Sequence, residues 1–212
     1  MNGRGDLLDP SAAIRAAVLA DPRVRSVDLV GSRAAGTATE LSDWDYRIAS
    51  SDSAAVAARL PGLVAVLRPL GQLWDPLART PVYMIILSGA VKADLFPGAP
   101  PGPGPDRASG GSLRDADAHF WDWNLWLGAK RLRGQDRVVA AELVKMWQHL
   151  LRPLGAPAPP ASQHDAVTTY LRLRADRERR DGETVPRDLG AAVITRMQAA
   201  RLLPAQTAED PC

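Results

Sequence analysis

The pattern of apolar and polar positions divides the chain into a first half with mixed periods and a second half with helical periods only. In the first half, apolar residues recur at every second position or in short runs, which is typical of β-strands. The predicted strands are VRSVDLV (24–30), DWDYRI (43–48), LVAVL (63–67), PVYMIIL (81–87) and AVKADLF (90–96). Two segments are expected to be helical instead, namely SAAIRAAVLA (11–20), capped by Ser11, and SDSAAVAARL (51–60).

The order of these elements predicts the fold class. Ser88-Gly89 separates the last two predicted strands by a short turn, which indicates an antiparallel hairpin. Helices and strands alternate irregularly along the first half, and neighbouring strands follow each other without a helix between them. This order favours an α+β fold with a mixed or antiparallel sheet over a doubly wound parallel sheet.

A segment rich in proline and glycine, residues 97–105, interrupts the pattern. It can hold neither a helix nor a central strand, so we expect a linker or a long surface loop. We therefore predict an N-terminal domain of residues 1–106 and a C-terminal α-helical bundle of residues 107–212. The helices expected in this bundle cover residues 115–133, 138–151, 163–180 and 187–203.

Composition narrows the class of protein. Hydrophobic residues make up 46% of the 212 residues, which is enough for a packed core and excludes global disorder. The net charge of +2 is small, so the many arginines are not taken as a sign of nucleic-acid binding. Cys212 is the single cysteine, and residues 1–10 contain no apolar stretch of the kind found in secretory signals. We expect a cytoplasmic protein that does not interact with a membrane.

Two acidic side chains carry the clearest chemical signal. Asp43 and Asp45 lie at the start of a predicted strand, two positions apart, so both project from one face of that strand. Paired carboxylates on one rigid face suit divalent ions such as Mg²⁺, which bind carboxylates together with substrate phosphates. Gly31 and Ser32 follow the preceding strand, where a sharp turn lets backbone amides and a hydroxyl approach a phosphate. This combination suits the transfer of a nucleotide.

The ordered set of an apolar strand, Gly-Ser, a spacer of about ten residues and Asp-x-Asp resembles the nucleotidyltransferase superfamily that includes DNA polymerase β. The stretch GSRAAGTATELSDWDYRI is most similar to the small bacterial members that modify aminoglycosides and lincosamides. The resemblance covers the N-terminal half of the chain. It implies a third acid on a later strand, which is Asp94 in AVKADLF. It departs at Ala35, where many members carry a basic or bulky residue, and this shifts the phosphate contact to Arg33.

The resemblance implies an enzyme of the nucleotidyltransferase class (EC 2.7.7 type). Its activity would be Mg²⁺-dependent transfer of a nucleoside monophosphate, expected to be AMP from ATP, to a hydroxyl of a small molecule such as an antibiotic. Asp43, Asp45 and Asp94 would be the catalytic residues and the ligands of two Mg²⁺ ions. Gly31, Ser32 and Arg33 would bind the NTP phosphates. No nucleic-acid partner is expected.

Several points stay open at the level of the sequence. The general base is either Asp94 or an acid of the helical domain, for which Glu142 is a candidate. A protein-adenylylating enzyme of the antitoxin type, or a non-catalytic nucleotide-binding protein with the same fold, would carry similar motifs. The acceptor, the preferred NTP and the oligomeric state are not specified by any pattern.

Other candidate features are interpreted as structural. The aromatic cluster of residues 120–126 is expected to be core, although aromatic rings also stack on bases. The arginines of residues 172–181 alternate with acids, which is typical of a solvated helix with intrahelical ion pairs. The three histidines, His119, His149 and His164, do not have the spacing of zinc ligands.

Overall fold

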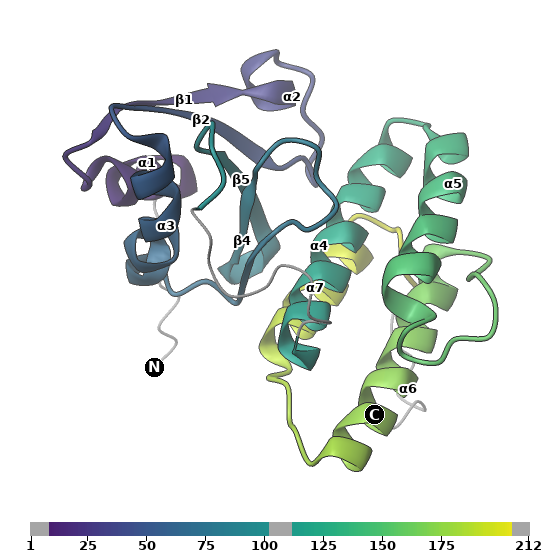
Figure 1. The fold of residues 1–212 in the computed structure, drawn as a ribbon. Coiled ribbons are helices and arrows are strands. Elements are labelled where there is room, and N and C mark those ends of the chain that lie inside the picture. The colour runs from purple at the N-terminus through teal and green to yellow at the C-terminus, as the bar shows by residue number, and fades with distance from the viewer. Residues whose placement is uncertain (1–8, 102–111, 205–212) are drawn as a thin grey trace, which may run out of the picture. The chain divides into compact units, whose positions relative to one another are not determined.

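The computed structural model describes residues 9–101 and 112–204 (Figure 1). The described residues form two compact units. The first contains the residues up to Thr37 and those from Asp43 to the gap at 102–111; the second contains Ala38–Ser42 and the residues after the gap. The predicted boundary at 106/107 lies outside the described residues. Ala38–Ser42 was expected to belong to the N-terminal domain, and the structure assigns it to the helical unit instead.

The first unit is built on a mixed sheet, as the sequence predicted. Within the described residues it has five strands in the order β1-β2-β5-β4-β3. The strands are β1 Val24–Val30, β2 Trp44–Ser50, β3 Gly71–Trp74, β4 Tyr83–Leu87 and β5 Val91–Phe96. β2 and β5 pair in parallel, whereas all other neighbours are antiparallel. The hairpin predicted at Ser88-Gly89 is confirmed, because β4 and β5 are joined by a short 3₁₀ turn, η2 Ser88–Ala90.

Two helices, α1 Pro10–Leu19 and α3 Ser53–Val64, cover one face of this sheet (Figure 1). Their apolar side chains form a core with alternate residues of the strands, and this core also includes Tyr46 of β2 and Ala93 of β5. The intervening residues of the strands, among them Asp45 and Asp94, therefore point to the opposite face of the sheet. The alternation thus separates the packed core from the acidic side chains.

Two local predictions in the first unit are wrong. Residues 63–67 are not a strand, because α3 continues through Pro61 to Val64 and is followed by a 3₁₀ turn, η1 Ala65–Leu67. The cap of α1 is Asp9 rather than Ser11, since the Asp9 side chain accepts a hydrogen bond from the backbone N–H of Ser11. The Ser11 hydroxyl instead accepts a hydrogen bond from Tyr46 Oη at 2.8 Å, which ties α1 to the middle of β2.

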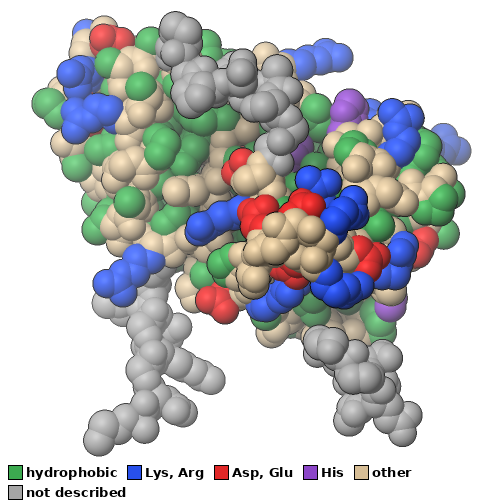
Figure 2. Space-filling view, turned by 60° about the horizontal axis from the view of Figure 1, so that its bottom comes forward, with side chains coloured by type: hydrophobic (Ala, Val, Ile, Leu, Met, Phe, Trp, Pro, Cys, Tyr) green, Lys and Arg blue, Asp and Glu red, His purple; other side chains and the backbone are tan. Residues whose placement is uncertain are grey.

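The second unit is helical within the described residues, in agreement with the predicted bundle. Its helices are α4 Leu113–Leu132, α5 Asp136–Met146, α6 Gln163–Asp181 and α7 Asp188–Ala199, and a π-helical turn, η3 Trp147–Leu151, extends α5. Ser112 and Ser162 cap α4 and α6 with their hydroxyl oxygens. Figure 2 shows acidic and basic side chains interleaved on the displayed face, without a single extended basic patch.

The predicted core role of the aromatic cluster is confirmed for its buried members, Phe120, Trp121 and Trp123. Trp121 is fully buried, and its indole N–H donates to Asp117 Oδ1 at 3.1 Å. The same oxygen accepts a hydrogen bond from Tyr170 Oη at 2.7 Å and forms an ion pair with Arg174 at 3.0 Å. This network stabilises the packing of α6 against α4 because a buried carboxylate needs such partners.

Candidate functional site

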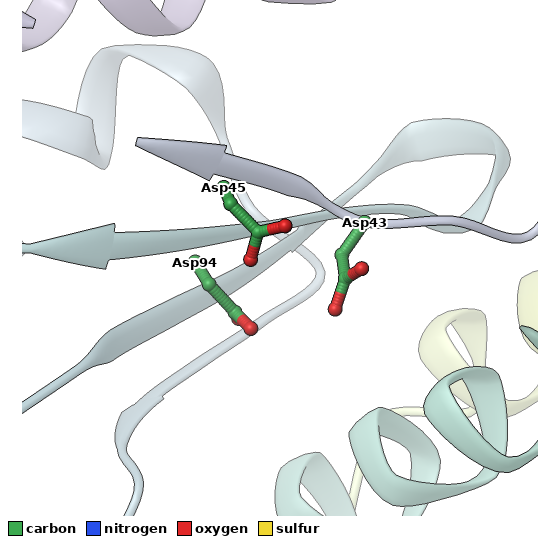
Figure 3. Close-up of side chains that lie close together, drawn as sticks. All are labelled: Asp43, Asp45 and Asp94. Carbon is green, nitrogen blue, oxygen red and sulfur yellow. The ribbon is translucent and has the colours of Figure 1, made fainter. Parts of the chain in front are cut away.

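Three carboxylates come together on the face of the sheet opposite the core of the first unit. One oxygen from each of Asp43, Asp45 and Asp94 lies within 4.8 Å of one from each of the other two. Figure 3 shows the three side chains pointing toward one another from β2, from the residue before it, and from β5. No other group of three His, Cys, Asp or Glu side chains in residues 9–101 and 112–204 is close enough to hold a metal ion.

The register of the sheet explains this convergence. β2 and β5 are parallel neighbours, and Asp45 is paired directly with Asp94. Directly paired residues on adjacent strands project from the same face of a sheet. Asp43 lies two residues before Asp45, where the chain enters β2, and therefore also reaches this face. Residues that are about fifty positions apart in the sequence are thus placed together by backbone pairing.

Lys92 connects two of these acids. Its Nζ donates to Asp43 Oδ2 at 3.0 Å and to Asp94 Oδ2 at 2.8 Å. The Lys92 side chain is only 6% exposed, compared with 16% for Asp43 and 14% for Asp94. Lys92 was not predicted to take part in the site, although its position two residues before Asp94 in a predicted strand placed it on the same face.

The surroundings of Asp94 disfavour the ionised form of its carboxyl group. Burial raises the pKa of Asp94 above its ordinary value; the ammonium of Lys92 lowers it in part, and the nearby carboxylate of Asp43 raises it further. Asp94 Oδ1 is buried and has no hydrogen-bond partner among the described residues. A buried, unpartnered carboxylate oxygen beside two further carboxylates is a suitable ligand set for a hard divalent cation such as Mg²⁺. The three residues therefore fit the metal that the sequence predicted.

Gly31 packs closely against the side chain of Asp45. It begins α2 Gly31–Ala34, a single helical turn after β1, and has a φ of +70°. A Cβ atom added to Gly31 would lie 2.9 Å from Cγ of Asp45 and closer still to Oδ2. Only glycine leaves this space and adopts this backbone conformation without strain. The predicted Gly-Ser turn thus contacts one of the acids, and its predicted contact with phosphate stays a prediction.

Ser32 and Arg33 follow in α2. Both are partly exposed, and the backbone carbonyl of Ser32 accepts a hydrogen bond from Thr37 N at 2.9 Å, which closes the turn. The Arg33 guanidinium lies over the ring of Trp44, 4.2 Å from its centroid, and its Nε donates to the carbonyl of Asp43 at 3.1 Å. Arg33 thus holds the start of β2, a role that sequence analysis missed. Its predicted role in phosphate binding is not tested by these contacts.

Glu142, the alternative general base, lies on α5 and forms an ion pair with Lys145 one turn along the helix. This is the arrangement of an ordinary polar helix face. The three histidines take no part in a group of metal-ligating side chains within the described ranges. Nor does any helix in these ranges combine the length and the apolar character that crossing a membrane would require.

Comparisons with known proteins give little further information. No protein-family model matches the sequence, and neither does any curated protein. Among solved structures, the chain is similar to the polymerase core of TRAMP, an RNA surveillance complex, with 16% sequence identity and a TM-score of 0.34. The similarity covers 88% of this chain, which spans 55% of the length of that structure. Such a TM-score is too low to establish a shared fold, and nothing about function is inferred from it.

Proposed function

We propose that this protein is a Mg²⁺-dependent nucleotidyltransferase that moves a nucleoside monophosphate from an NTP to a hydroxyl group and releases pyrophosphate. The observation that supports this function is the convergence of Asp43, Asp45 and Asp94, whose ligand oxygens lie within 4.8 Å of one another. In this proposal, the three carboxylates hold two Mg²⁺ ions. When bound, such ions neutralise charge on the phosphates and lower the pKa of the attacking hydroxyl.

Residues of the protein would bind the NTP phosphates and accept the proton of the attacking hydroxyl. The amides and hydroxyl of the Gly31-Ser32 turn would donate to the β- and γ-phosphates, and Arg33 would add positive charge. The Asp94 carboxylate would receive the proton of the acceptor hydroxyl, because burial raises its pKa and so favours its protonated form. Glu142 is a weaker candidate for the base because it pairs with Lys145.

The substrates are proposed from the sequence resemblance. We take ATP as the NTP and a small hydroxylated molecule, such as an aminoglycoside or lincosamide antibiotic, as the acceptor. A small-molecule acceptor is the class to test first, because the sequence most resembles members that modify small antibiotics.

A pyrophosphate-release screen tests this function. Each of the four NTPs is combined with a panel of aminoglycosides, lincosamides and nucleoside-like metabolites, with Mg²⁺ and with EDTA. We expect release that requires Mg²⁺ and an acceptor and that decreases by at least about a hundredfold in Asp43→Asn and Asp45→Asn. Asp28→Asn is the matched control, because Asp28 is an exposed carboxylate on β1.

The screen separates the proposed enzyme from the related possibilities. Transfer within tenfold of wild type in Asp43→Asn or Asp45→Asn would contradict the metal assignment. Mg²⁺-dependent NTP binding without release of pyrophosphate from the NTP in the presence of any acceptor would indicate a binding protein. Release that requires a protein acceptor rather than a small molecule would indicate a protein-adenylylating enzyme.

A further inference from the structure

A charged lysine is energetically unfavourable at the buried position of residue 92. It lies on β5, an inner strand of the sheet, directly opposite Ile86 of β4, and its side chain is 6% exposed. Burying an ammonium requires compensation by paired acids, and apolar residues of similar volume often replace buried ion pairs without loss of stability. Packing alone therefore does not explain a lysine here.

The contacts of Lys92 involve two of the side chains that would bind a metal. Nζ donates to Asp43 Oδ2 and Asp94 Oδ2, and both side chains belong to the group of three carboxylates shown in Figure 3. Each hydrogen bond engages a carboxylate oxygen, and the positive charge lies within hydrogen-bonding distance of the proposed ligands. Two cations this close repel one another strongly in a partly buried site.

We propose that Lys92 is a resident cation of the acidic site, which weakens the binding of free Mg²⁺ and makes metal binding depend on the phosphates of a bound nucleotide. Three carboxylates with one ammonium keep an excess of negative charge, but less than the carboxylates alone. The phosphates of an NTP add the negative charge that offsets repulsion between the metal and Lys92. The nucleotide half of this inference rests on the proposed function, whereas the effect on free metal does not.

A metal titration without nucleotide tests the first half. Mn²⁺ binding, followed by electron paramagnetic resonance, and Mg²⁺ binding, followed by calorimetry, are compared between wild type and Lys92→Met. We expect the variant to bind either ion roughly tenfold more tightly or better, because the repelling charge is removed while the length of the side chain is kept. Lys145→Met, which removes an exposed lysine paired with an acid on α5, should leave the affinity unchanged. Equal or weaker binding by Lys92→Met would overturn the proposal.

A second measurement uses the unmodified protein, in case Lys92→Met does not fold. The chain has three lysines, Lys92, Lys130 and Lys145, so the Nζ signals of lysine-labelled protein can be assigned by NMR. Saturation with Mg²⁺ should shift the Lys92 signal, because the metal would bind the same two carboxylates to which Lys92 Nζ donates. Lys130, which lies over the ring of Trp126, and Lys145 should not respond. An unchanged Lys92 signal at saturating Mg²⁺ would contradict the inference.

The nucleotide half is tested with a non-hydrolysable ATP analogue. The analogue should increase Mn²⁺ affinity more in wild type than in Lys92→Met, since the variant has less repulsion to offset. An equal increase in both proteins would refute the coupling. These measurements do not depend on transfer, so a failure of the pyrophosphate screen and a failure of the Lys92 inference can be distinguished.

Discussion

Gly31 lies so close to Asp45 that the space for a Cβ atom at residue 31 is already filled by the Asp45 carboxylate. The turn after β1 and the acid of β2 are therefore a single structural feature, although fourteen positions separate them in the sequence. Antiparallel pairing of the two strands, in which Val30 lies opposite Asp45, creates this contact. Glycine at position 31 therefore leaves room for the Asp45 carboxylate in the acidic site, whether or not Gly31 also contacts a phosphate.

Gly31→Ala should displace the Asp45 carboxylate and weaken metal binding by at least about tenfold, since a methyl group would overlap with it. Gly36→Ala is the matched control. Gly36 has a φ of +68°, close to the +70° of Gly31, but an added Cβ would meet nothing within 4 Å. Both variants should lose roughly 1 kcal/mol of stability from backbone strain. Mn²⁺ titration measures the difference, and similar affinities in the two variants would show that the contact with Asp45 does not matter.

The sequence could predict which side chains of one strand project from the same face, because successive side chains of a strand alternate between its two faces. Lys92 and Asp94 were placed on one face in this way, and the structure confirms it. The pairing of β2 with β5 could not be predicted in detail. Which strands become neighbours depends on how the helices and the sheet pack as a whole, and no local pattern encodes it.

The failure at residues 63–67 has a local cause. The predicted helix ended at residue 60, and Gly62 was taken as a break before a strand. The structure keeps α3 helical beyond Gly62, since Leu60 and Val64 are fully buried one turn apart on its apolar face. Tertiary burial of this face outweighs the local preference. The helical spacing of these residues was present in the sequence and was the signal to follow.

Ser32→Ala should weaken NTP binding more than it slows chemistry. A phosphate contact made before and during the reaction is largely uniform binding, which changes KM rather than kcat. The loss of one neutral hydrogen bond should cost on the order of 1 kcal/mol, or about fivefold in affinity. Steady-state kinetics against NTP measures both constants, with Ser26→Ala on β1 as the control. An unchanged KM would rule out this role for Ser32.

Asp94→Asn should stabilise the metal-free protein at neutral pH. Burial raises the pKa of Asp94 in the folded state, so the ionised carboxylate is less stable there than in the unfolded chain. The stability that protonated Asp94 contributes is fully present below the unfolded pKa and is lost as the pH rises through the raised folded pKa. Asparagine cannot ionise and does not incur this loss.

Thermal unfolding in EDTA over a pH series measures this effect. The melting temperature of Asp94→Asn should exceed that of wild type near neutral pH, and the difference should disappear below about pH 4, where both proteins are uncharged at this position. Asp28→Asn, at an exposed position on β1, should show no such trend. A variant less stable than wild type at neutral pH would mean that the ion pair with Lys92 outweighs desolvation. Mg²⁺ should reverse the order, because only the wild type offers the third carboxylate.

The last prediction concerns the 38–42 segment, which packs with the helical unit and leads directly into Asp43. Leu41 is buried there, and a Cβ added to Gly128 would lie 2.7 Å from its side chain. Ser42 Oγ accepts hydrogen bonds from Arg133 at 2.8 Å and from the backbone N–H of Thr39 at 2.8 Å. These contacts fix the residue immediately before the first acid of the site.

Arg133→Ala should therefore lower metal affinity by up to about fivefold, because losing one hydrogen bond costs on the order of 1 kcal/mol and frees the chain ahead of Asp43. Arg131→Ala, at an exposed position on the last turn of α4, is the control and should have no effect. Mn²⁺ titration and thermal unfolding should be measured on both variants. A loss of affinity without a matching loss of stability supports positioning of Asp43 through Ser42. If Arg133→Ala loses stability but keeps the metal affinity of wild type, Arg133 only stabilises the helical unit.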